Sequence, residues 1–333
     1  MTEALFLTSA DVDDLAEPAD YVAAVRNAYR QIGDGASAEP RTKLLNRKPP
    51  GMLTTYAAVL PETGAMGGYT YSAGFGGEDA WFMTPLFDAN SGEPLALLDG
   101  ASMNPFKTGA AGAVAVDALA RADATELAVI GSGAQARGQL ATTATVRDFE
   151  AVRVFSPTAE NRKSFAAEFD NRIDADVSAV QSASEAVAGA DVVITATTAS
   201  EPVIDDADVD PGTHVTAMGQ YNPNKNELPP ALIARATYVL DLRARATQDA
   251  GSFIAAVDAG LVDEADGVAA ELGEVVTGDH PGRTTEDEVT VFDSGGTGIE
   301  TAATAHMLYK RASDRGRGKP IDFAPASEAL TGQ

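Results

Sequence analysis

The pattern of hydrophobic and polar positions divides the chain into two parts. Over residues 11–35, apolar side chains recur at helical spacing, and the pattern ends at two glycines. Short apolar runs broken by Pro and Gly follow, at 41–46, 52–60, 66–74, 81–88 and 95–99. Such runs between turn residues are typical of antiparallel strands, and SGEP (91–94) is typical of a hairpin turn. The small, apolar stretch 104–123 then predicts a helix.

After Ala124 the pattern of hydrophobic and polar positions changes. Apolar runs now alternate with helical or loop segments, at 126–131, 151–156, 174–180, 191–197, 214–219 and 237–242. This alternation indicates a largely parallel sheet covered on both faces. The stretch 295–310 predicts a helix that returns to the first part. We therefore predict an α/β nucleotide-binding domain inserted into a split α+β domain.

The charge balance narrows the class of partner. The 333 residues carry 24 Lys and Arg against 49 Asp and Glu, a net charge of −25, and only seven of the bases are Lys. So acidic a surface repels nucleic acid and acidic membranes, and we expect neither as a partner. One interpretation is an ordinary acidic protein of the cytoplasm. The other, which we favour, is a salt-adapted (halophilic) protein.

Several kinds of site and location are excluded by composition. The chain has no Cys, and its three His are scattered, so we expect no disulfide, no thiolate site and no metal. No run approaches the roughly 20 apolar residues needed to cross a bilayer. The beginning, MTEALFLTSADVDD, carries acids where an export signal carries bases, so we expect a cytoplasmic protein.

A glycine-rich loop follows the first apolar run of the second part. The stretch GSGAQARGQLAT begins at Gly131 directly after LAVI, and Gly131, Gly133 and Ala136 fit the pattern G-x-G-x-x-[GA]. The first Gly permits a tight turn, the second lets a pyrophosphate approach the backbone, and the small third residue lets the helix pack on its strand. We therefore predict a Rossmann-type sheet that binds a dinucleotide. Its phosphate contacts are expected at Gly131, Ser132, Gly133, Ala134 and Gln135.

The end of the next apolar run bears on the choice of dinucleotide. Folds of this type that prefer NAD usually carry Asp or Glu there, to bind the ribose 2′-hydroxyl. This chain has Ser156, followed by Thr158 and Arg162. Hydroxyls and a guanidinium suit a 2′-phosphate, so we favour NADP as the cofactor, with NAD as the alternative. The plainer interpretation of Arg162 is a solvated helix residue.

Further cofactor contacts are expected at the carboxyl edge of the sheet, because ligands of open parallel sheets bind there. Two runs end at this edge and supply candidate side chains and backbone groups. These are Thr195, Ala196 and Thr197 from one run, and Met218 and Gly219 from the next.

The chain resembles a known family along nearly its whole length, the ornithine cyclodeaminase/mu-crystallin family, which also includes an archaeal type of alanine dehydrogenase. The resemblance depends on the order and spacing of several segments. They are EPRTKLL, GEPLALLD, FKTGAAGAVAVDALA, VIGSGAQARGQL, DVVITATTASEPVI, THVTAMGQYNPNKNELPPALIARA, AAELGEVVTGDHPGR and VFDSGGTGIETAATA.

The resemblance implies a homodimer with one Rossmann domain in each subunit. The predicted domains are then a dimerisation and substrate domain at 1–118 plus 301–333 and a dinucleotide domain at 119–300. The active sites would lie in the cleft between these domains. The implied reaction is hydride transfer between a nicotinamide and the α-carbon of an amino or imino acid. Ser294 and Gly295 resemble the family's late cofactor-contacting loop.

The resemblance also assigns residues to the substrate. Arg41 stands where the family places the Arg that holds the substrate carboxylate, and a planar fork of donors suits that group. In the family motif R-T-G-A-A an Arg precedes Thr, whereas this chain has Lys107 before Thr108, so the charge is kept but the fork is lost. Thr108 opens a helix where a phosphate or nicotinamide contact is expected, and a plain helix start is the alternative.

Two departures from the family concern catalysis. The family's Gly-Val-Lys aligns with Gly68-Tyr69-Thr70, which has no Lys, and the Asp used by cyclodeaminases aligns with Tyr221. Strict ornithine cyclodeamination therefore loses its expected base. Tyr221, Tyr69 and Thr70 are expected to form a smaller hydrogen-bonding pocket. Tyr221 is the candidate proton donor, with Lys107 lowering its pKa, or else a wall of the pocket.

We accordingly predict an NAD(P)-dependent oxidoreductase acting on a small amino, imino or keto acid, of the imine or ketimine reductase or amino acid dehydrogenase type. Ornithine cyclodeaminase and alanine dehydrogenase are the alternatives within this class. A protein that binds a nucleotide and a small ligand without catalysis, as in mu-crystallin, is the alternative from another class.

Overall fold

The computed structural model describes residues 2–77, 79–219 and 221–331. Contacts within the chain group it into two compact units, each of which is described by itself. One contains Met1–Asn104 and Thr297–Gln333, and the other contains Pro105–Gly296.

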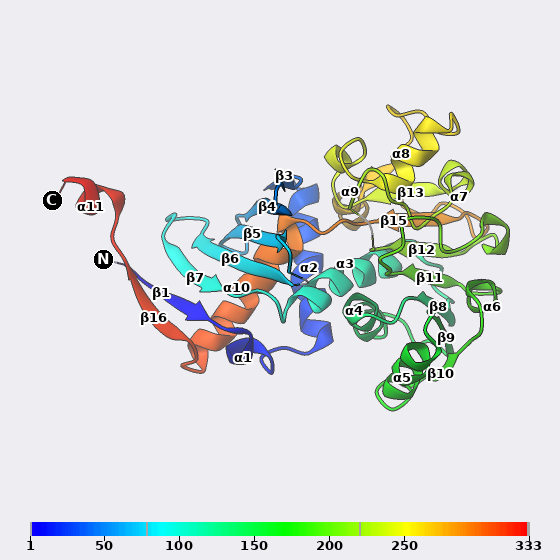
Figure 1. Cartoon of the computed structure of the whole chain (residues 1–333), viewed down its shortest axis with the longest axis horizontal. Coiled ribbons are helices and arrows are strands. Elements are labelled where there is room, and N and C mark those ends of the chain that lie inside the picture. Colours follow the sequence, from blue (N-terminus) through cyan, green and yellow to red (C-terminus); the bar gives the residue numbers. More distant parts are fainter. Residues whose placement is uncertain (1, 78, 220, 332–333) are drawn as a thin grey trace. The chain divides into compact units, whose positions relative to one another are not determined.

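The first unit combines a mixed sheet with two long helices (Figure 1). The strand order is β16-β1-β7-β6-β5-β4-β2, and β3 also pairs with β4. Pairs β3–β4, β4–β5, β5–β6 and β6–β7 are antiparallel, whereas β1 and β7 are parallel. The elements are β1 (Thr2–Leu7), α1 (Ser9–Val12), α2 (Pro18–Gly33), β2 (Ser37–Ala38), β3 (Thr42–Arg47), β4 (Pro50–Leu60), β5 (Ala65–Gly74), β6 (Ala80–Asp88), β7 (Pro94–Leu98), α10 (Gly298–Asp314), β16 (Lys319–Phe323) and α11 (Ala326–Thr331).

The two faces of this sheet differ in burial. Alternate residues of β4 and β5 point inward, including Tyr56, Tyr69 and Tyr71, and all three are buried. Helix α10 packs against β4 and β5, and α2 packs against α10 (Figure 1). The approach of α10 is close, because a Cβ at Gly298 would lie 2.2 Å from the carbonyl carbon of Ala57. The other face, here called the outer face, keeps large apolar side chains exposed, as described below.

The second unit is a parallel sheet of eight strands with helices between them (Figure 1). The strand order is β10-β9-β8-β11-β12-β15-β13-β14. Its elements are α3 (Asn104–Leu119), β8 (Glu126–Ile130), α4 (Ala134–Thr143), β9 (Ala151–Phe155), α5 (Ala159–Phe169), β10 (Asp176–Ala179), α6 (Ala183–Val187), β11 (Val192–Thr195), β12 (His214–Ala217), α7 (Pro230–Arg235), β13 (Thr237–Leu240), α8 (Gly251–Asp258), β14 (Ala270–Glu271), α9 (Leu272–Thr277) and β15 (Thr290–Asp293), with 3-10 turns η1 (Asp206–Asp208) and η2 (Arg243–Arg245).

Both faces of this sheet are covered, which explains why its strands are continuous apolar runs. In β8, Leu127 and Val129 join one buried cluster with side chains of α4 and α5. Ala128 and Ile130 join a second cluster with side chains of α6, α7 and α8. A strand buried on both faces has no polar face and so cannot show alternation.

The predicted fold class is confirmed: along the chain, the segment that forms a parallel, doubly covered sheet is inserted between the two segments that form a unit with a mixed sheet and helices. The helical pattern predicted over 11–35 is two helices, because Pro18 begins α2 and no helix hydrogen bond can pass through its missing N–H. Helix α3 makes most of its contacts with the second unit and is counted there from Pro105 onward. The domain borders at 118/119 and 300/301 stay predictions. In the described part of the chain, no helix has the length and apolar character needed to span a bilayer.

Candidate functional site

The glycine loop connects β8 to α4 in the second unit. Gly131 has φ +130°, and a Cβ there would lie 2.4 Å from the carbonyl oxygen of Ala196, so only glycine fits without a shift of the backbone. The Gly131 N–H donates to the carbonyl of Phe155 at 2.8 Å, which links the loop to the end of β9. The predicted tight turn is therefore present, and it lies between the carboxyl ends of β9 and β11.

Gly133 differs from Gly131 because it faces open space. It is the N-cap of α4, and a Cβ there would meet no atom within 4 Å. Gly133 and Ala134 are exposed, so the unpaired N–H groups at the start of this ten-residue helix are accessible. Ala136 is fully buried and lets α4 pack on the sheet. A diphosphate can reach the backbone at this point.

A side-chain amide adds a polar group at the same helix start. The Oε1 atom of Gln135 is buried and has no hydrogen-bond partner among the described residues. Ser132 lies next to it in the chain and donates through Oγ to Ser156 Oγ at 2.9 Å. The loop and the end of β9 thus share a polar contact on the side where a ribose is expected.

Arg162 is buried rather than solvated, so the plainer interpretation of this residue is wrong. Its side chain donates to the carbonyl of Ser156 at 2.9 Å and to Oε1 of Gln181 at 3.0 Å, and it lies 5.7 Å from the centre of the Phe155 ring. These acceptors are neutral, so they leave the positive charge of the guanidinium uncompensated. Thr158, the N-cap of α5, is exposed beside it.

The carboxyl ends of β11 and β12 are joined by a carboxylate that sequence reasoning missed. Glu227 is buried and accepts from Thr195 Oγ1 at 3.0 Å, from the Thr197 N–H at 2.7 Å and from the Gly219 N–H at 2.8 Å. Burial raises the pKa of Glu227, whereas these three hydrogen bonds act in the opposite direction. A Cβ at Gly219 would lie 2.4 Å from Glu227 Oε1. Glu227 therefore fixes the edge that we predicted from the sequence.

Ala196 and Met218 complete this edge through their backbones. The Ala196 N–H donates to Ile130 and the Met218 N–H donates to Thr195, both at 2.9 Å. Both side chains are nearly buried. The residues predicted at the ends of β8, β11 and β12 are thus neighbours in the structure.

A second buried carboxylate holds the turn after β15. Asp241 accepts from Ser294 Oγ at 2.8 Å and from the Gly295 N–H at 3.1 Å. Its other oxygen accepts from Arg245 Nη1 at 2.7 Å. A Cβ at Gly295 would lie 2.5 Å from Arg245 Nη2, so the turn packs directly against the guanidinium and leaves no room for a side chain.

Two more carboxylates surround Arg245, and all four groups are buried. Asp249 accepts from Arg245 Nε at 2.8 Å, and Asp293 lies 3.6 Å from Nη2. Burial raises the pKa of Asp293 to about 6, although Arg245 and the hydrogen bond from Tyr238 oppose this. The sequence signal for Asp241 and Asp293 was an acid at the end of an apolar run, in YVLDL and VFDS.

Helix α3 brings Lys107 and Thr108 into the second unit as buried residues. The Thr108 carbonyl accepts from Gln139 Nε2 of α4 at 3.0 Å. The two helices touch through glycines, because a Cβ at Gly109 would lie 2.4 Å from the carbonyl oxygen of Gly138. This close crossing sets the start of α3 beside the helix that follows the glycine loop.

Arg41 lies in the first unit, just before β3, and is only 3% exposed. Its guanidinium carbon is 5.4 Å from the centre of the Tyr56 ring, and Nη1 donates to the Tyr71 hydroxyl at 3.4 Å. The guanidinium is therefore held against aromatic side chains of β4 and β5, away from bulk water. Such a site strengthens its attraction for a carboxylate.

The structure does not bring Thr70 next to Arg41. In register, Thr70 pairs with Thr55, and the two hydroxyl oxygens are 3.3 Å apart on the outer face. Arg41 lies with Tyr56 and Tyr71 on the inner face. Side chains alternate along a strand, so the inward neighbours of Thr70 are Tyr69, which we had predicted in the substrate pocket, and Tyr71, which we had not assigned.

Tyr221 belongs to the loop after β12 and is 39% exposed. Its neighbour Gln220 lies outside the described residues. Its assignment as proton donor or pocket wall stays a prediction.

His214 is buried in the second sheet, where both ring nitrogens are hydrogen-bonded to threonines. Its two ring nitrogens lie 2.9 Å from Thr290 Oγ1 and from Thr216 Oγ1, and burial lowers its pKa to about 3, so it is neutral. Over residues 2–77, 79–219 and 221–331, no group of three or more His, Asp or Glu is arranged to hold a metal ion.

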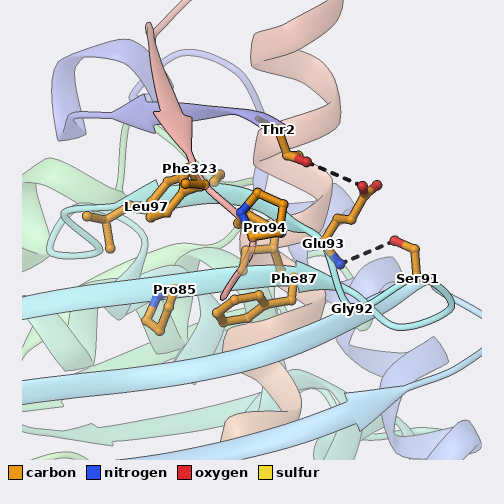
Figure 2. A pocket seen from close by; sticks show the side chains of 13 residues that line it. Thr2, Pro85, Phe87, Ser91, Gly92, Glu93, Pro94, Leu97 and Phe323 are labelled. Carbon is orange, nitrogen blue, oxygen red and sulfur yellow. Dashed lines mark hydrogen bonds between the residues drawn. The ribbon is translucent and has the colours of Figure 1, made fainter. Parts of the chain in front are cut away.

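The outer face of the first sheet carries exposed apolar side chains and two hollows. Leu44, Leu53 and Trp81 lie in one row across β3, β4 and β6, with Ser72 of β5 between them, and are 63%, 45% and 72% exposed. One hollow, of about 510 Å³, includes Thr55 and Thr70. The other, of about 480 Å³, lies beside the end of β16 (Figure 2). Its labelled lining residues are Thr2, Pro85, Phe87, Ser91, Gly92, Glu93, Pro94, Leu97 and Phe323.

Comparison with known proteins agrees with this picture. The ornithine cyclodeaminase/mu-crystallin family matches residues 2–316. A Delta(1)-pyrroline-2-carboxylate reductase of Bacillus cereus is 36% identical over 239 residues, which are 72% of this chain and 73% of the relative.

Two solved structures are similar over nearly the whole chain. The Delta(1)-pyrroline-2-carboxylate reductase of Thermococcus litoralis, in complex with NADH and L-proline, has a TM-score of 0.89 and 31% identity, covering 95% of this chain and 100% of its own. An archaeal alanine dehydrogenase dimer with bound NAD has a TM-score of 0.89 and 30% identity, covering 97% and 100%. This chain therefore belongs to the ornithine cyclodeaminase/mu-crystallin family.

Proposed function

We propose that this protein is an NAD(P)H-dependent reductase of small α-imino acids, with cyclic imino acids of the pyrroline-2-carboxylate type as the main substrate class. One observation carries the proposal: the buried Arg41 guanidinium, held against two tyrosines, occurs in a chain that also presents an open glycine loop. The first group suits a small carboxylate, and the second suits a pyrophosphate. The relatives named above include reductases of this substrate class.

The second unit would hold the dinucleotide. The pyrophosphate would lie on the glycine loop, and the nicotinamide half on the edge held by Glu227 and the turn held by Asp241. When bound, the reduced nicotinamide supplies a hydride. The proposed contacts are Thr108, Gly131, Ser132, Gly133, Ala134, Gln135, Thr195, Ala196, Thr197, Met218, Gly219, Ser294 and Gly295.

The substrate would be held by its carboxylate. Arg41 would bind it through two donors of the guanidinium, and Lys107 would add a second positive charge. Fixing the carboxylate also fixes the adjacent α-carbon, which accepts the hydride. The imine nitrogen gains a proton in the same reaction, because an iminium accepts hydride more readily than a neutral imine.

We propose NADPH as the preferred cofactor, with NADH also used. Ser156 replaces the acid that would bind a 2′-hydroxyl, Thr158 adds an exposed hydroxyl, and Arg162 contributes an uncompensated positive charge nearby. Introducing the acid as Ser156→Asp should repel a 2′-phosphate and reverse the preference. The ratio of kcat/KM for NADPH to that for NADH should fall at least about 10-fold. An unchanged ratio would contradict this placement.

We also propose a homodimer formed through the outer face of the first unit. Its exposed Leu44, Leu53 and Trp81, together with Met83 (54% exposed), form an apolar surface of the kind that monomers rarely leave uncovered. Trp81→Asp places a charge on this surface and should yield monomers in light scattering after size exclusion. Leu261→Asp, at an exposed position of the second unit, is the matched control and should leave the dimer intact.

Salt adaptation is the remaining proposal from composition. At −25, mutual repulsion of carboxylates opposes the compact state, and salt screens that repulsion. The unfolding temperature should therefore rise steadily from 0.1 M to 2 M KCl. A flat dependence would leave only an ordinary acidic protein.

The function is tested by oxidation of NADPH and NADH in high salt. The panel contains cyclic imino acids, 2-keto acids with ammonia or methylamine, and L-ornithine or L-alanine with the oxidised cofactors. We expect the highest kcat/KM with a cyclic imino acid. Preference for pyruvate with ammonia would indicate an alanine dehydrogenase, and proline formation from ornithine a cyclodeaminase. Tight cofactor binding without any turnover would indicate a binding protein and refute the proposal.

A further inference from the structure

Three tyrosines lie on the inner face of the first sheet, and two of them, Tyr56 and Tyr71, contact Arg41. Tyr56 comes from β4, and Tyr69 and Tyr71 come from β5, two residues apart and on the same face. Their rings form one cluster with Phe82 of β6, whose centre lies 4.9 Å from that of Tyr71 in a stacked arrangement. The cluster holds the rings in place, so the three tyrosines differ mainly in what their hydroxyl groups contact.

The three hydroxyls have different neighbours. Tyr69 donates to the carbonyl of Gly100 at 2.6 Å, and the Tyr56 hydroxyl is hydrogen-bonded to Thr301. Both are thus engaged in holding the fold. The Tyr71 hydroxyl instead accepts from Nη1 of Arg41 at 3.4 Å. Of these three, it is the hydroxyl that lies against the guanidinium.

The chemistry of an α-imino acid makes this position informative. The carboxylate and the imine nitrogen are bonded to the same α-carbon, so a guanidinium that binds the carboxylate brings the nitrogen within a few ångströms of its own neighbours. A hydroxyl both accepts and donates, so Tyr71 can accept from Arg41 and still direct its proton elsewhere. This argument rests on the proposed function.

We propose that Tyr71 is the catalytic proton donor to the imine nitrogen. The lone pair of the imine nitrogen takes the proton of the Tyr71 hydroxyl, which leaves an iminium and a tyrosinate. The hydride then forms a C–H bond at the α-carbon, the electron pair of the C=N π bond becomes the lone pair of a neutral amine, and water returns a proton to the tyrosinate. The guanidinium of Arg41 stabilises the negative charge on the tyrosinate oxygen.

Tyr71→Phe tests the proposal because it removes only the hydroxyl. We expect kcat with the cyclic imino acid to fall about 100-fold, a typical contribution of general acid catalysis, with KM changed less than about threefold. The wild-type rate should also fall at high pH as the donor loses its proton, and the variant should lack this decline. The controls are Tyr69→Phe, whose hydroxyl binds Gly100, and Tyr221→Phe, the donor suggested by the sequence.

A substrate that needs no proton separates catalysis from structure. A cyclic imino acid methylated at nitrogen is permanently cationic, so Tyr71→Phe should reduce it at nearly the wild-type rate. Equal losses with both substrates would assign Tyr71 a structural role, and no loss with either, or the selective loss in Tyr221→Phe, would also overturn the proposal. If the wild-type protein reduces neither substrate, the proposed function fails and Tyr71 loses its role with it.

Discussion

Backbone groups form most of the surface of the glycine loop, whereas side chains form the surroundings of Arg41. In the loop, Gly131 is required by its φ of +130° and by contact with Ala196, and Gly133 leaves open space at a helix start. Around Arg41, Tyr56 of β4 contributes its ring and Tyr71 of β5 contributes its hydroxyl. The comparison teaches that the proposed dinucleotide site depends on a few local positions, while the proposed carboxylate site depends on the register of the sheet.

The largest expected effect concerns Arg41. Arg41→Ala should lower kcat/KM for the imino acid by about 100- to 1000-fold, mainly through KM, because a buried charged hydrogen bond to the carboxylate is lost. Arg41→Lys keeps the charge without the fork and should recover part of the loss. The Kd of NADPH, measured by fluorescence titration, should stay within twofold in both variants. A large change in that Kd would contradict the proposal that Arg41 binds the substrate and not the dinucleotide.

The next effect contrasts the two glycines. Gly133→Val adds bulk where nothing stands within 4 Å, so the unfolding temperature should change little while the Kd of NADPH rises at least about 10-fold. Gly131→Ala should instead lower the free energy of unfolding by about 2–4 kcal/mol, because φ and the Ala196 carbonyl both exclude a Cβ. Calorimetry and titration of both variants measure this. Equal behaviour of the two would contradict the distinction.

The third prediction concerns the edge held by Glu227. Glu227→Gln replaces one acceptor oxygen by an NH₂ group that faces an N–H or O–H donor, so at least one hydrogen bond is lost, at a cost of about 1–3 kcal/mol. The Kd of NADPH should rise about 10-fold, with KM for the imino acid little changed at saturating cofactor. A higher KM for the imino acid with an unchanged Kd of NADPH would contradict this role and indicate that Glu227 acts on substrate binding.

The smallest expected effect is a pH dependence of stability. The pKa of Asp293 is about 6 in the folded protein against 3.8 in the unfolded chain, so the folded state binds more protons between these values. Stability contributed by protonated Asp293 is therefore lost as pH rises from about 4 to 6. Asp293→Asn lacks this titration and should gain about 2 kcal/mol relative to wild type between pH 4.5 and 7.5. Denaturant unfolding at both pH values measures the difference, and a constant difference would contradict it.

The sequence predicted the fold class and the positions of the strand ends and the glycine turn, while the roles of these residues in binding stay predictions. Short apolar runs, Gly131 and Gly133 are local signals, and each specifies a strand end or a turn without knowledge of distant residues. The residues predicted at the ends of β8, β11 and β12 lie together because parallel strands share one carboxyl edge.

Features made by distant side chains were not predictable in the same way. Thr70 was placed with the substrate, but a one-residue change of register moves a side chain to the other face, and only the pairing with Thr55 reveals this. Arg162 has the sequence context of a surface helix, and its burial depends on Gln181, in the loop before α6. Glu227 holds strands β11 and β12 from a loop that shows no periodicity.

The most direct test of the central claim is substrate pairing with Arg41. Initial rates are measured for wild type and Arg41→Ala with a cyclic imino acid and with its neutral carboxamide. Wild type should prefer the carboxylate by at least about 100-fold in kcat/KM, and Arg41→Ala should lose nearly all of this preference while reducing the carboxamide at a rate close to that of wild type. An Arg41→Ala variant that keeps the full preference for the carboxylate would contradict the account.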